Sequence, residues 1–158
     1  MLRKQLLQPV ESHGSGGEIS IADTATVLVT SELPDHPIDH ICDGQRGPGS
    51  TQWIAEQSGD QTVVLVFDTA RNVDTVSLEI EEREVSRTQE LTLATSRDGG
   101  QTYREVLRQE FNFSPSGTTF EHEEWRLAAE GITNLRVWIR PDKGGKPCRV
   151  SMTSLVLQ

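Results

Sequence analysis

The chain has 158 residues, of which 34% are hydrophobic and 25% are charged, a composition compatible with one globular domain that has a sizeable core. Fifteen Lys and Arg residues against 24 Asp and Glu residues give a formal net charge of −9. So acidic a surface repels nucleic-acid phosphates and anionic membranes, and no apolar run reaches transmembrane length. We therefore expect neither nucleic acid nor membrane insertion among its interactions.

The N-terminal 17 residues are expected to form a flexible leader. They end in "SHGSGG" (12–17), which is rich in small residues, and their basic residues are not followed by the apolar core of a signal peptide. If the chain is complete, this predicts a cytoplasmic protein. The folded domain is expected to span residues 18–158.

Five segments carry the patterns of β-strands. The apolar run "TVVLVFD" (62–68) predicts a strand buried on both faces, whereas "VSLEIEE" (76–82), "ELTLATS" (90–96) and "NLRVWIR" (134–140) alternate between apolar and polar residues. The last segment, "CRVSMTSLVL" (148–157), changes parity between Met152 and Leu155, which suggests a β-bulge. The residues expected to point inward are Val76, Leu78, Ile80, Leu91, Leu93, Leu135, Val137 and Ile139. With no long periodic helix, the chain is predicted to be all-β, an antiparallel β-sandwich or jelly roll.

The segment "SRDGGQTY" (96–103) fits the Asp-box pattern, Ser-x-Asp-x-Gly-x-Thr-aromatic, found on the blades of sialidase-type propellers. The pattern occurs once, however, and a propeller needs several blades. Asp98 can accept hydrogen bonds from a turn backbone, and the two following glycines can adopt positive φ. We therefore interpret the segment as a tight hairpin turn between two strands.

Four segments, in order, resemble a known family. They are "ICDGQRGPGSTQW" (41–53), "DQTVVLVFDTARNVDTVSLEI" (60–80), "LTLATSRDGGQTYREV" (91–106), and "ITNLRVWIRP" with "VSMTSLVL" (132–157). Together they resemble a discoidin domain of the galactose-binding-like superfamily, which includes many bacterial carbohydrate-binding modules. The resemblance covers about residues 19–157. It implies an eight-stranded jelly roll of two antiparallel sheets, with a ligand bound by loops at one end and often a structural calcium ion nearby.

The resemblance places Asp43 and Thr51 where the family draws calcium ligands, and backbone carbonyls of residues 45–50 could complete a set of oxygens. The family also supplies a Glu from the last strand, and the matching position here is Ser154. Losing that carboxylate removes charge from the site. The alternative is that Asp43 only caps its own turn.

The loop "PDHPIDHICDG" (34–44) contains three candidate ligand-binding residues, His36, Asp39 and His40. Members of the family often use this loop against sugar hydroxyls. Imidazole and carboxylate groups together could also bind a transition metal, but the spacing matches no closed zinc pattern, and Pro37 allows at most a short helical turn. The plainer alternative is a polar loop whose two isoleucines are anchored in the core.

Two arginines follow the strand predicted at 76–82. The resemblance points to Arg83, and Arg87 lies in the same connection. A guanidinium group offers five donors in a fixed fork, which suits adjacent sugar hydroxyls. Alternatively, these arginines pair with the glutamates of "EIEEREVSR" (79–87) in a solvated loop.

Sugar binding usually needs an apolar surface on which a ring can stack, and only 5% of the residues are aromatic. Trp53 and Trp125 are expected in the core, whereas Phe113 precedes the turn "SPSG" and could project into a loop. We therefore add Phe113 to the predicted ligand-binding residues.

Cys42 and Cys148 are far apart in the sequence and form no CxxC motif. We expect two free thiols, because no signal peptide directs the chain to an oxidising compartment. A disulfide between the two remains the alternative.

The sequence predicts a binding protein and not an enzyme. No spacing singles out a pair of catalytic carboxylates, and no Gly-x-Ser-x-Gly elbow is present. The leading hypothesis is a non-catalytic module that binds a carbohydrate through loops at one end of the jelly roll. The alternative is a scaffold subunit that binds a protein partner, for which Trp138, flanked on its strand face by Arg136 and Arg140, is the candidate surface.

Overall fold

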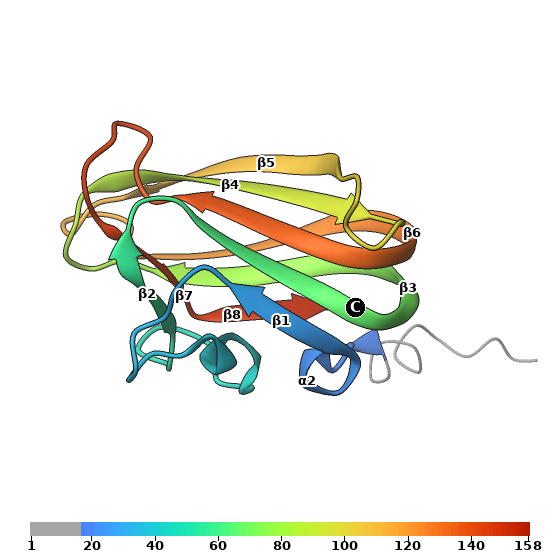
Figure 1. Ribbon diagram of the computed structural model, residues 1–158. Coiled ribbons are helices and arrows are strands. Elements are labelled where there is room, and N and C mark those ends of the chain that lie inside the picture. Colours follow the sequence, from blue (N-terminus) through green and yellow to red (C-terminus); the bar gives the residue numbers. More distant parts are fainter. Residues whose placement is uncertain (1–16) are drawn as a thin grey trace, which may run out of the picture.

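The structure is a computed structural model that describes residues 17–158, so the expected leader, apart from Gly17, lies outside the described residues. Eight strands and two short helices form a β-sandwich (Figure 1). In chain order the elements are α2 (Ile21–Thr24), β1 (Ala25–Val29), the 3-10 helix η1 (Ile38–Cys42), β2 (Trp53–Ser58), β3 (Gln61–Glu81), β4 (Arg87–Ser96), β5 (Arg104–Phe113), β6 (Phe120–Arg140), β7 (Arg149–Met152) and β8 (Ser154–Leu157). The predicted all-β, eight-stranded sandwich is confirmed.

Strands β3 and β6 are each 21 residues long, and each contributes to both layers of the sandwich. The front layer of Figure 1 has the strand order β1-β3-β6-β4-β5. In the layer behind it, the second half of β3 pairs with β8 on one side and with the first half of β6 on the other. The register between β3 and β6 shifts from Val66 to Thr75, where both strands turn from one layer to the other. In β6 this bend holds Ala128 at φ 48° and Gly131 at φ 60°.

The alternating strands bury the side chains that the pattern predicted, from Val76 in β3 to Ile139 in β6. The expectation for residues 62–68 is wrong in one respect. Val63, Leu65 and Phe67 are buried, but Val64 is only half-buried, because it lies on the outer face of the front sheet. There its partner on β1, Leu28, is 53% exposed. This outer face is therefore open to solvent.

The parity change in the last segment reflects a change of partner and not a bulge within one strand. Residues before Thr153 form β7, which pairs with β2, and residues after it form β8, which pairs with β3. Trp53 is fully buried, as predicted. Trp125, also expected in the core, is only partly buried, and its ring packs edge-on against Phe111 at the edge of the core, at 6.4 Å between centroids.

The hairpin predicted at residues 96–103 is confirmed. The carboxylate of Asp98 accepts hydrogen bonds from the backbone N–H of Thr102, at 2.9 Å, and from its hydroxyl group. Gly99 and Gly100 adopt φ angles of 76° and 89°, which a side chain would strain. The turn therefore fixes the pairing of β4 with β5.

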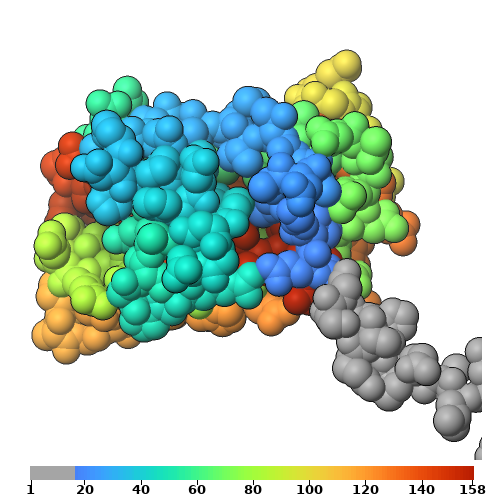
Figure 2. Space-filling view, turned by 90° about the horizontal axis from the view of Figure 1, so that it is seen from below, coloured from blue at the N-terminus to red at the C-terminus, as the bar shows by residue number. Residues whose placement is uncertain are grey.

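The loops divide between the two ends of the sandwich. The connections 82–86, 114–119 and 141–148 lie at one end, on the left in Figure 1, while the β4–β5 turn and the bends of β3 and β6 lie at the other. The long β1–β2 connection, coloured from blue to cyan, covers much of one face (Figure 2). No helix among residues 17–158 is long and apolar enough to cross a membrane.

Candidate ligand-binding groove

A groove of about 940 Å³ runs along the loop end of the sandwich, between the edge of β2, the β3–β4 connection and the start of β7. We call it the end groove. The residues that line it are Leu33, Gln52, Ile54, Glu56, Ser58, Glu81, Glu82, Arg83, Glu84, Val85, Pro147, Cys148, Arg149 and Ser151. Its size falls within the range of about 300 to 1,000 Å³ that is typical of small-molecule sites.

The end groove has an acidic wall and an aliphatic wall. Four glutamates and two arginines line it, and their charges are partly neutralised within the protein. Glu81 pairs with Arg83, whereas Glu56 and Glu84 form no ion pair with any residue in 17–158. These two carboxylates therefore remain free to accept hydrogen bonds from a ligand.

Arg83 lies in the end groove, at the place where the sequence predicted a ligand-binding arginine. Its side chain is 60% exposed, and one Nη donates to Glu81 Oε2 at 3.1 Å. The alternative drawn from the sequence, an ion pair with a neighbouring glutamate, is therefore present, and ligand binding by the remaining exposed donors stays a prediction. The contact with Glu81 orients the guanidinium group across the groove.

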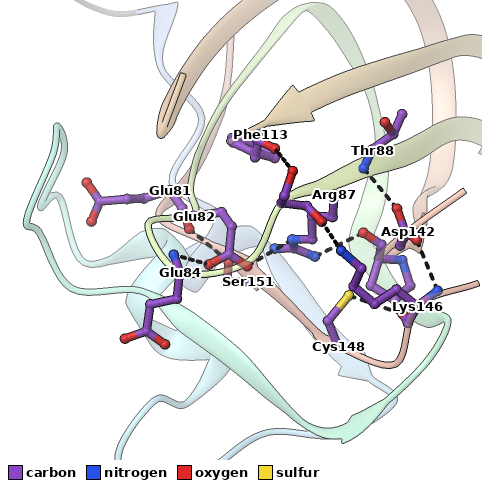
Figure 3. A network of polar contacts seen from close by, with 12 residues as sticks. Glu81, Glu82, Glu84, Arg87, Thr88, Phe113, Asp142, Lys146, Cys148 and Ser151 are labelled. Carbon is purple, nitrogen blue, oxygen red and sulfur yellow. Dashed lines mark hydrogen bonds and ion pairs between the residues drawn. The ribbon is translucent and has the colours of Figure 1, made fainter. Parts of the chain in front are cut away.

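Arg87 is a structural residue, so the expectation that it contacts a ligand is wrong. Its guanidinium group is completely buried, and Nε lies 2.9 Å from Glu82 Oε1 while Nη1 donates to the carbonyl of Pro141 at 3.2 Å (Figure 3). The group also lies over the ring of Phe113, 5.8 Å from its centroid. Arg87 begins β4 with its side chain directed inward, which is why it ties the loops together beneath the groove.

The prediction that Phe113 contacts a ligand is also wrong. It is only 3% exposed, and its ring stacks on Phe111 at 6.5 Å between centroids. Both phenylalanines point inward because a single residue, Asn112, separates them along β5, which places them on the same face. No aromatic side chain lines the end groove, in the part of the chain that the structure describes.

The three loop residues His36, Asp39 and His40 do not line the end groove. The ring of His40 contacts the backbone through Nδ1, which lies 2.9 Å from the carbonyl oxygen of Gln52, and packs edge-on against His36. As predicted, Pro37 is followed by only a short helical turn, η1, and its Ile41 is buried in the core. The two histidines thus support the strand that forms the groove.

The residues expected to bind calcium do not fit a cation as they are arranged. Asp43 Oδ1 accepts from the backbone N–H of Gln45 at 2.9 Å, and Oδ2 accepts from the hydroxyl of Thr51. This is the alternative in which Asp43 caps its own turn. Both carboxylate oxygens are thereby engaged by donors of the same loop.

Two backbone N–H groups of this loop donate to carboxylates of β3, which is the opposite of the cation contact that the sequence suggested. The backbone N–H of Gly47 donates to Glu79 Oε1 at 2.9 Å, and that of Gly49 donates to Glu81. The hydroxyl of Ser154, at the position where the family has a Glu, donates to the same Glu79 oxygen at 3.2 Å. Among residues 17–158, no group of three or more His, Cys, Asp or Glu side chains is arranged to hold a metal ion.

Both cysteines are free thiols with raised pKa values. Burial, reinforced by the nearby carboxylates of Asp39 and Asp43, raises the pKa of Cys42 to about 11. Burial also raises the pKa of Cys148, which lines the end groove beside the Arg87 network. Both thiols are therefore protonated at neutral pH and are poor nucleophiles.

Solved structures with the same fold include modules of glycoside hydrolases. One is CBM32-3 from a family 31 glycoside hydrolase of Clostridium perfringens, with a TM-score of 0.66 and 16% identity, covering 91% of this chain and 96% of that one. The fold is that of the CBM32 modules. It agrees with the predicted galactose-binding-like jelly roll.

Two further structures with this fold are described by the sugar that they bind. CpGH89CBM32-4 of Clostridium perfringens, in complex with GlcNAc-α-1,4-galactose, has a TM-score of 0.61 and 17% identity, and the match covers 89% of this chain and 93% of that one. A chitosan-binding module from a chitosanase/glucanase of Paenibacillus has the same TM-score and identity, with coverages of 89% and 98%. No family model and no curated protein matches this sequence.

Sequence reasoning missed several residues of the end groove. Glu56 and Arg149 come from β2 and β7, two short strands that pair with each other through an irregular register. Their pairing joins segments that are more than 90 residues apart in the chain, and no local pattern indicates it. The connection after β3 was found through the family resemblance, which pointed to Arg83, whereas its glutamates were interpreted only as ion-pair partners of the arginines.

Proposed function

We propose that the protein is a non-catalytic module that binds a carbohydrate in the end groove. The observation that carries this proposal is the end groove itself, which lies at the loop end of a fold shared with carbohydrate-binding modules and includes the exposed guanidinium group of Arg83. Two neighbours with this fold are described with sugar ligands, GlcNAc-α-1,4-galactose in one and chitosan in the other.

The end groove offers the two kinds of contact that a sugar needs. Arg83 donates hydrogen bonds to ring hydroxyls, and the free carboxylates of Glu56 and Glu84 accept hydrogen bonds from them. The apolar face of a sugar ring lies against the aliphatic side chains of Leu33 and Ile54, which take the place of an aromatic platform.

A glycan array followed by titration calorimetry tests the proposal. The array should include neutral sugars and amino sugars, because the surplus of carboxylates in the end groove favours a ligand that donates hydrogen bonds or carries a positive charge. Arg83→Ala is expected to weaken binding about tenfold or more, since a hydrogen bond to a charged group contributes about 1.5–3 kcal/mol.

Arg126→Ala is the matched control, because Arg126 is an exposed arginine of β6 that does not line the groove. It should bind the same glycan as the unaltered protein. If the folded protein binds no glycan at all, or if both substitutions weaken binding equally, the proposal is wrong.

The second candidate function, a scaffold that binds a protein partner, is favoured by the open outer face of the front sheet. There the ring of Trp138, flanked by Thr62 and Thr92 on the neighbouring strands, lies only partly buried under the guanidinium group of Arg140, at 5.3 Å. Affinity capture should then return one stable partner, and Trp138→Ala should abolish its recovery. Unchanged recovery by the variant would exclude this face as the interface.

A further inference from the structure

A second cavity lies at the opposite end of the sandwich, where the β4–β5 turn lies beside the bend in β6 (Figure 1). Its volume is about 640 Å³, and its walls come from residues 95–106 and 127–132. We call it the far-end cavity. Like the end groove, it falls within the size range of small-molecule sites, about 300 to 1,000 Å³.

Both walls of the far-end cavity are held in fixed conformations. On one side, hydrogen bonds from Thr102 lower the pKa of Asp98 to about 2, so this carboxylate stays ionised and directed into its own turn. On the other side, Ala128 adopts φ 48°, a strained value for a residue with a side chain, and Gly131 donates its N–H to Asn72 at 2.9 Å. The cavity is therefore preformed and needs little ordering on binding.

The far-end cavity is lined by two positively charged side chains that form no ion pair with any described residue. Arg97 and Arg104 line it and are exposed, and neither forms an ion pair or a side-chain hydrogen bond with any residue in 17–158. Of the two glutamates in its walls, Glu105 is already engaged by both Arg108 nitrogens, at 3.0 and 3.2 Å. Asp98 and Glu130 are the other carboxylates of these walls, and Asp98 is engaged by Thr102 of its own turn, which leaves Glu130 beside two guanidinium groups that have no ion pair, in a chain whose net charge is −9.

An amphipathic surface accompanies these charges. Tyr103 lines the cavity, and the guanidinium group of Arg136 lies 4.1 Å from the centroid of its ring. This contact fixes the ring and brings a third positive charge close to the cavity. Val106, which is 37% exposed, and Leu127 add an apolar surface beside it.

We propose that the far-end cavity is a second binding site, which takes a sugar that carries a carboxylate. Arg97 and Arg104 bind the carboxylate, because the planar guanidinium fork matches its two oxygens, and the sugar ring lies against Tyr103 and Val106. A neutral sugar would leave both guanidinium groups without a counter-charge. The proposal does not depend on the end groove, which lies at the other end of the sandwich and is acidic.

The experiment is a titration of the ¹⁵N-labelled full-length protein with glucuronic acid, followed by amide chemical shifts. Glucose and acetate are titrated in parallel as the neutral sugar and the bare carboxylate. Glucuronate is expected to shift amides of residues 95–106 and 127–132, while glucose does not, and acetate binds at least about tenfold more weakly because it lacks the ring contacts. The double variant Arg97→Gln/Arg104→Gln should weaken glucuronate binding about tenfold or more.

Arg46→Gln is the control, since Arg46 is an arginine of similar exposure that pairs with Glu18 away from the cavity. It should bind glucuronate as the unaltered protein does. Equal binding of glucose, equal binding of acetate, or full binding by the double variant would each overturn the proposal. Shifts at residues 81–85 and 147–151 alone would place the acidic sugar in the end groove, which would overturn the second site while leaving the first intact.

Discussion

Two arginines only four residues apart have opposite roles. Arg83, in the β3–β4 connection, keeps its side chain 60% exposed, whereas the side chain of Arg87 is completely buried. The difference arises from the strand that begins at Arg87, since alternate residues of β4 point inward and Arg87 occupies the first inward position. Its charge is compensated there by Glu82, which is itself 15% exposed.

Arg87→Ala is predicted to destabilise the fold by about 3–5 kcal/mol, because it leaves the carboxylate of Glu82 without its buried partner. Arg83→Ala should cost about 1 kcal/mol, less than Arg87→Ala, since the side chain of Arg83 is 60% exposed even though its partner Glu81 is only 10% exposed. Urea denaturation of the two variants measures both free energies of unfolding. Equal losses would mean that the ion pair with Glu82 does not hold the loops at this end.

At the scale of elements, the strands and the hairpin turn at 96–103 were predictable, whereas the loops that form the end groove were not. Alternation along residues 76–82 and 134–140 reports directly which side chains enter the core, and Asp98 with two glycines reports a hairpin. The orientation of Phe113 depends on where β5 ends. Phe113 is the last residue of this strand, so its side chain follows the strand's alternation into the core and does not project from the following loop. The end groove forms from pairings between distant segments, so no local pattern indicates Arg149, and Arg83 was found through the family resemblance.

The loop between η1 and β2 leads to a prediction about calcium. Its backbone N–H groups at Gly47 and Gly49 bind the carboxylates of Glu79 and Glu81, so anions hold the loop where the sequence suggested a cation. We expect neither calcium nor a chelator to change the melting temperature. Glu79→Ala should lower the free energy of unfolding by about 1–3 kcal/mol, because it leaves the N–H of Gly47 and the buried hydroxyl of Ser154 unpaired.

Glu56→Ala is the matched control, since Glu56 is an exposed glutamate that forms no ion pair with any described residue. It should change the stability by no more than about 0.5 kcal/mol. Thermal unfolding followed by circular dichroism, with and without calcium, measures both effects. A rise of the melting temperature with calcium that disappears in Asp43→Ala would show that the loop does bind the ion.

At the scale of the whole molecule, the two layers share their central strands. The first half of β3 and the second half of β6 lie in the front sheet, and the other halves lie in the back sheet, so neither layer can separate without breaking both strands. The two cavities lie at opposite ends of this shared framework. We therefore expect the sandwich to unfold as one cooperative unit.

Substitution of Gly131 at the bend of β6 tests this expectation. A Cβ at Gly131 would meet no atom within 4 Å, so the cost of Gly131→Ala comes from the positive φ of 60° alone and should be about 1 kcal/mol. Gly117→Ala, in a turn where the added Cβ makes an ordinary contact with Ser114, is the control and should be neutral or slightly stabilising. Urea unfolding is followed by circular dichroism, which reports all strands, and by the fluorescence of the three tryptophans, which are Trp53 in β2 and Trp125 and Trp138 on the two halves of β6. The midpoints should coincide and shift together in Gly131→Ala; a shift of one probe without the other would show that the layers unfold separately despite their shared strands.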